Sequence, residues 1–126
     1  MTIRKLLFSL PILFLICGAQ LALAATQAVR DMAGILAHLE HRPSGAEKGT
    51  LKAIIDNKAT TAQERVLATA ISNFEHAAAD ADKPKLKQVM NDASAPAEVR
   101  EMAGIVLDMS HHPSGSEKDK LQKMMK

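Results

Sequence analysis

The chain has 126 residues, with 16 lysines and arginines, 14 acidic residues, and no tryptophan or tyrosine. Arg4 and Lys5 lie in a leader-like segment, and without them the count of basic residues falls from 16 to 14, equal to the acidic count. Beyond that segment the one aromatic residue is Phe74. Nucleic-acid-binding proteins normally show a basic surplus and aromatic stacking platforms, so the composition argues against a nucleic-acid partner.

Residues 1–24 have the pattern of a cleaved signal peptide. Two basic residues precede a largely apolar run at 6–16, and residues 22–24 (ALA) have the small-x-small form of a signal-peptidase site. The run is short and contains Pro11, so we expect no stable membrane span after cleavage; a retained span is the alternative. Cys17 leaves lipidation as a further alternative.

Residues 25–126 are then expected to form the mature protein, a single domain that is periplasmic or secreted. This part of the chain contains no cysteine, because the only one in the sequence lies in the leader. An exported domain without disulfides must be stabilised by packing alone. The alanine-rich composition is typical of a bacterial envelope protein.

The most informative feature of the mature domain is a repeat. Residues 29–35 (VRDMAGI) return as 99–105 (VREMAGI), and 41–48 (HRPSGAEK) return as 111–118 (HHPSGSEK). A weaker copy of the unit lies halfway between these two. It is recognised from residues that lie 35 positions from a residue of matching type on both sides: Arg65, Leu67, Ala68, Ile71, Phe74, His76, Asp82, Lys83 and Leu86. A fixed period of this length indicates an array of helical units. The three units cover approximately residues 25–58, 59–93 and 94–126.

Each unit is expected to fold as helix, short turn, helix. The first helix carries an apolar stripe, which is Val29, Met32, Leu36 and Leu39 in unit one, Leu67, Ile71 and Phe74 in unit two, and Val99, Met102, Val106 and Met109 in unit three. The second helix is anchored in turn by Leu51, Leu86 and Leu121. Three segments fit the capping box that starts a helix: 44–47, 61–64 and 114–117. The predicted fold is all-α, with three stacked helical hairpins forming a short solenoid-like array.

Residues 91–103 (NDASAPAEVREMA) resemble the start of a HEAT repeat, with an acidic turn before a Pro-x-Val-Arg sequence and an alanine-containing helix. Poorer versions surround Arg30 and Arg65. The resemblance implies a right-handed solenoid of helical hairpins in which acidic residues and these arginines form a ladder. The period is shorter than is usual for that family, and a tetratricopeptide-like or unrelated hairpin array is the alternative.

Histidine is the one residue type that points to a ligand. His41, His76 and His111 occupy the same repeat position, and His38 and His112 lie beside two of them. All five are candidate metal ligands. Stacked helices lie about 8–10 Å apart, however, so a linear array would keep the three equivalent rings from sharing one ion. We therefore favour no metal site and no cofactor, and interpret the three as helix-end residues that bond free carbonyls.

No pattern of a catalytic site is present. Ser44 with His41, and Ser114 with His111, could be read as nucleophile and base, but their recurrence favours a turn and a helix cap. We expect a non-enzymatic binding or adaptor protein of the bacterial envelope that presents the faces of its repeats to a protein or peptide. The alternatives are a small periplasmic metal-binding protein and an envelope stress chaperone. The sequence leaves the oligomeric state open.

Overall fold

The computed structural model describes residues 25–126, and the predicted signal peptide lies outside the described residues. This part of the chain forms six helices: α2 (Gln27–Ala37), α3 (Gly45–Asp56), α4 (Ala62–Ser72), α5 (Lys83–Met90), α6 (Ala97–Asp108) and α7 (Gly115–Met124). Residues 25–126 contain no strand, only three isolated single-residue bridges in the turns. The prediction of an all-α fold with two helices in each unit is confirmed.

Side-chain caps fix where most of these helices begin. Ser44, Thr61 and Ser114 each accept a hydrogen bond from the backbone N–H three residues later, and the glutamate at that position bonds back to the cap residue. All three predicted capping boxes are therefore present. Such a cap stabilises a helix by about 0.5–2 kcal/mol because it satisfies N–H groups that have no partner within the helix.

The core is built from the predicted apolar stripes. Leu51, Leu86 and Leu121 are each fully buried at equivalent places in the three units, as predicted. Phe74 is also fully buried, and Leu39 and Met109, its equivalents in the other units, are each 2% exposed. These three residues are the last of each first-helix stripe. Their buried side chains anchor the chain in the core just before each within-unit turn.

The helices pack differently from a linear stack of hairpins. The closest pairs are α3 with α4, α5 with α6, and α7 with α2, so each second helix packs mainly on the first helix of the next unit. The first helices α2, α4 and α6 also contact one another on the inside of the assembly. Because α7 returns to α2, the last unit packs on the first and the three units form a closed ring.

Equivalent contacts support this closure. A Cβ placed on Gly104 in α6 would lie 3.4 Å from the Sδ of Met90, and one on Gly34 in α2 would lie 3.5 Å from the Sδ of Met125. The first contact joins consecutive units, and the second joins the last unit to the first. The chain therefore uses one packing arrangement both between neighbours and across the ring closure.

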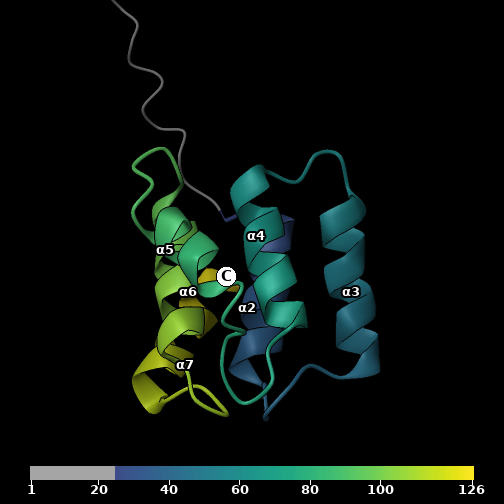
Figure 1. Cartoon of the computed structure of the whole chain (residues 1–126), viewed down its shortest axis with the longest axis vertical. Helices are drawn as coiled ribbons and strands as arrows, with labels where there is room; N and C mark the ends of the chain where they lie inside the picture. The colour runs from purple at the N-terminus through teal and green to yellow at the C-terminus, as the bar shows by residue number, and fades with distance from the viewer. Residues whose placement is uncertain (1–24) are drawn as a thin grey trace, which may run out of the picture.

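The two kinds of connection lie at opposite ends of the molecule. The turns within units, which follow α2, α4 and α6, come together at the lower end in Figure 1, and the connections between units lie at the upper end. In the part of the chain that the structure describes, no helix combines the length and hydrophobicity needed to cross a membrane.

Candidate metal centre

The three within-unit turns have an unusual backbone. His41, His76 and His111 have φ angles of 68°, 63° and 66°, and within residues 25–126 no other residue, glycine included, has a positive φ. In the first and third turns the residue after the histidine donates its N–H to the carbonyl of the residue before it, at 2.7 Å, which is the bond of a γ-turn. Left-handed backbone of this kind costs a side-chain-bearing residue of order 1–3 kcal/mol.

A ring of backbone hydrogen bonds joins the three turns. The His41 N–H donates to the His111 carbonyl at 2.7 Å, the His76 N–H to the His41 carbonyl at 2.7 Å, and the His111 N–H to the His76 carbonyl at 2.6 Å. Each histidine thus donates to one partner and accepts from the other. The three backbones are held in fixed positions around a common axis.

The imidazoles of these three histidines also converge. His111 Nδ1 lies 3.2 Å from His41 Nδ1 and 3.1 Å from His76 Nδ1. The ring centroids are 4.9, 5.2 and 5.0 Å apart, and one nitrogen of each residue lies within 4.8 Å of the other two. All three histidines are exposed. We call His41, His76 and His111 the histidine triad.

The spacing of the triad suits a small divalent cation. With metal–nitrogen bonds of about 2.0–2.1 Å, two nitrogens on a tetrahedral ion lie about 3.3–3.4 Å apart. The observed Nδ1 separations of 3.1 and 3.2 Å need only a few tenths of an ångström of adjustment. The expectation that the repeats hold these rings too far apart is therefore wrong, because the units close around an axis instead of stacking in line.

The helix-end interpretation of the triad is also wrong. α2, α4 and α6 end at Ala37, Ser72 and Asp108, three or more residues before each histidine. The role predicted for the triad belongs to His38 instead, which caps α2 and places its Nδ1 2.9 Å from the Gly34 carbonyl.

The other candidate ligands lie outside the triad. His112 places its Nδ1 3.2 Å from the Pro113 carbonyl, and His112 and His38 line one pocket together with Glu40 and Lys118. Across residues 25–126, the triad is the one group of three or more potential ligands whose atoms come this close together. Of the five candidate histidines, the fold thus brings three together and leaves two apart.

The serines beside the triad act as caps. Ser44 Oγ accepts from the Glu47 N–H at 3.1 Å and Ser114 Oγ from the Glu117 N–H at 3.2 Å. Each hydroxyl is thus directed at the first turn of its own helix. This arrangement agrees with the predicted turn-and-cap role.

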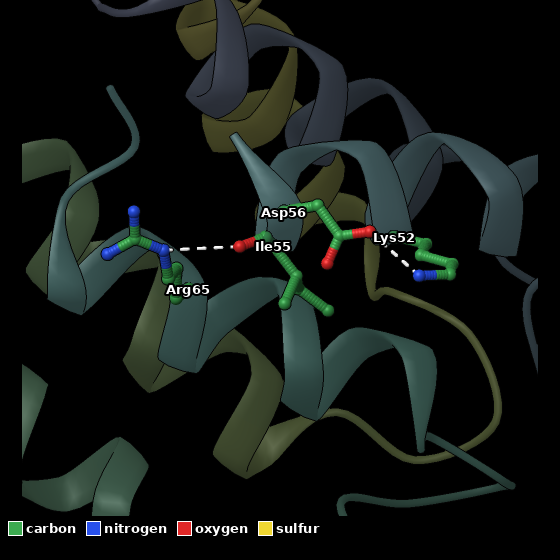
Figure 2. A network of polar contacts seen from close by, with 4 residues as sticks. All are labelled: Lys52, Ile55, Asp56 and Arg65. Atoms are coloured by element: carbon green, nitrogen blue, oxygen red, sulfur yellow. Dashed lines mark hydrogen bonds and ion pairs between the residues drawn. The ribbon is translucent and has the colours of Figure 1, made fainter. Parts of the chain in front are cut away.

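The repeated arginines lie at the opposite end of the bundle. The Arg65 guanidinium donates to the carbonyls of Ile55, Asn57 and Lys58 at 3.2, 2.9 and 3.3 Å. Figure 2 shows the first of these bonds, which joins α4 to the end of α3. Arg100 bonds the Ala95 carbonyl at 3.1 Å in the same way. Arg65 and Arg100 therefore hold the connections between units.

The acidic residues at this end bond other partners. Asp56 pairs with Lys52 at 2.7 Å, and this hydrogen bond raises the pKa of the Lys52 ammonium (Figure 2). Asp92 accepts from Ser94 and Gln63, and these bonds lower the pKa of its carboxyl group. Within the described range, no ion pair joins Arg65 or Arg100 to an acidic residue, so the ladder implied by the HEAT resemblance is not seen there.

Comparison of the chain with family models, with curated proteins and with solved structures finds no match.

Proposed function

We propose that the protein is an exported metal-binding protein that holds one divalent cation on the Nδ1 atoms of His41, His76 and His111. The observation that carries the proposal is the convergence of three exposed imidazoles, one from each unit, at Nδ1 separations of 3.1 and 3.2 Å. Export, and the location in the periplasm or outside the cell, rest on the signal-peptide pattern of residues 1–24.

The backbone beneath the triad supports a ligand-binding role. The left-handed conformation of the three histidines costs free energy on folding. Residues with such strained backbones persist only where the surrounding structure keeps them in that conformation, and they cluster at functional sites. A turn alone would be served as well by glycine or asparagine, yet all three positions carry histidine. The ring of hydrogen bonds holds the three histidine backbones together before an ion arrives, which reduces the entropy that binding must overcome.

The ligand chemistry limits the ions. Neutral imidazoles suit zinc, copper, nickel and iron, whereas magnesium and calcium prefer oxygen ligands. For Nδ1 to bind, each ring must carry its proton on Nε2. Protons and metal compete for the same nitrogens, so binding must weaken as the pH falls through the range where imidazoles protonate.

Metal titration tests the proposal. Protein freed of metal by chelation and dialysis is titrated with Zn²⁺, Cu²⁺ and Ni²⁺ in a calorimeter at neutral pH. At least one ion should bind with a stoichiometry of one and submicromolar affinity. His76→Asn should lower that affinity by more than the roughly 10–100-fold that loss of an outer-shell contact alone causes. Asparagine is chosen because it tolerates a positive φ, so the turn is retained.

His38→Asn and His112→Asn are the matched controls, because both residues lie beside the triad in sequence but outside it in space. Their affinities should equal that of the unaltered protein. Weak binding of every ion, or a tight site that survives His76→Asn, would contradict the proposal. The predicted role as an adaptor for a protein or peptide, without enzymatic activity, stays a prediction.

A further inference from the structure

We infer that an ion on the triad keeps an exchangeable coordination position that faces solvent and accepts a small anion. This inference rests on the proposed function, since it concerns the same ion. The inference adds a property of that ion, which is that it holds a water molecule that an external ligand can replace. The inference follows from the number of ligands that the triad supplies and from the exposure of the residues around it.

The triad supplies one face of a coordination sphere. Its three histidines can supply three nitrogens to one ion, whereas a tetrahedral ion such as zinc takes four ligands. At least one position on the ion therefore remains for another ligand.

The surroundings of the triad leave that position open to solvent. The backbone N–H and carbonyl groups of all three histidines already bond one another. Each triad histidine and the residues directly before and after it are exposed: Glu40, His41, Arg42, Glu75, His76, Ala77, Ser110, His111 and His112. Water can therefore reach the remaining position on the ion.

Within residues 25–126, no further histidine, cysteine, aspartate or glutamate brings a ligand atom into the triad. The group of converging ligand atoms contains the three histidines and no carboxylate. Glu40 and Glu75 each precede a triad histidine but are not members of the group. Three protein nitrogens with a position left to water are the arrangement of catalytic zinc sites, whereas structural sites are closed by four protein ligands.

Cobalt and azide test the inference. The full mature protein is loaded with Co²⁺, whose visible absorption reports its coordination, and sodium azide is then added. The expected result is a saturable change in the cobalt bands, as one azide takes the position that one water leaves. Equilibrium dialysis should show that the cobalt stays on the protein throughout.

The possible outcomes separate the inference from the proposed function. If cobalt binds at the triad but azide leaves its spectrum unchanged, the position is closed and the inference fails while the metal site stands. If no divalent ion binds, the proposed function fails and the inference with it. His112→Asn and the double variant Glu40→Gln/Glu75→Gln should bind azide as the parent does. A clear gain in azide affinity in either would show that one of those side chains fills the position, which would overturn the inference.

Discussion

At one end of the bundle, Arg65 and Arg100 each bond the chain that connects their own unit to the one before it, whereas at the other end the three histidines bond one another. The arginine contacts span 5 to 10 residues of sequence, and the contacts between histidines span 35 and 70. Both ends repeat with the same period, but one is made of separate local contacts and the other of a single shared centre.

This difference shows what closure adds to a repeat. A local contact such as that of Arg65 with the end of α3 forms wherever a unit follows another, so it would exist equally in an open stack. The contact between His41 and His111 requires the last unit to return to the first. Repeated residues therefore have a structural role where their equivalents stay apart, as the arginines do. They form a shared site where their equivalents meet, as the histidines do.

The largest expected effect is at Phe74, which anchors the chain two residues before His76. Phe74→Ala removes a fully buried aromatic side chain and should lower the free energy of unfolding by about 3–5 kcal/mol. Urea denaturation followed by circular dichroism measures the change. Met90→Ala is the control, because Met90 is 39% exposed and should lose less than about 1 kcal/mol. Similar losses for the two variants would contradict the packing described here.

The next effect is at the connection end. Arg65→Met keeps an unbranched side chain but leaves the carbonyls of Ile55, Asn57 and Lys58 without their guanidinium donor, at a cost of about 1–2 kcal/mol. The affinity for metal should not change, because the contact is local and distant from the triad. Calorimetry of Zn²⁺ binding to the folded variant checks this. A large fall in affinity would show that the two ends are coupled.

The smallest effect compares two replacements of one triad residue. Both His111→Ala and His111→Gly remove a ligand, so both should lose the tight metal site. Glycine adopts a φ of 66° without strain, so His111→Gly should be more stable than His111→Ala by about 0.5–1 kcal/mol, after allowing for the greater freedom of glycine in the unfolded chain. Thermal unfolding of the metal-free proteins measures the difference. Equal stabilities would mean that the turn relaxes once the imidazole is gone.

The local part of this structure could be predicted from the sequence. Capping boxes such as Ser114 with Glu117, and apolar residues at helical spacing, depend on neighbours only a few positions away. The ring could not be predicted in the same way. A period of 35 residues determines which faces are buried, but the angle between successive units decides whether the array runs in a line or returns on itself.

One feature of the sequence does indicate that the triad histidines have a function of their own. The second unit has alanine at all three positions of 77–79, where the first unit has Arg-Pro-Ser and the third has His-Pro-Ser, yet it keeps His76. A histidine that persists where its surrounding motif is lost indicates a role of its own. The positive φ gave no such signal, because it falls on histidine, while the glycines next to the cap serines, Gly45 and Gly115, have ordinary backbone angles.

The ring of three backbone bonds also limits how such a protein can arise and change. Open repeat proteins lengthen or shorten by duplicating or deleting a unit, and the remaining contacts are preserved. Here a fourth unit would have to enter between α7 and α2, separating His41 from His111 and opening the cycle in which each histidine both donates and accepts. Gene duplication could therefore have built the chain up to three units, but a further copy would remove the centre that the first three create.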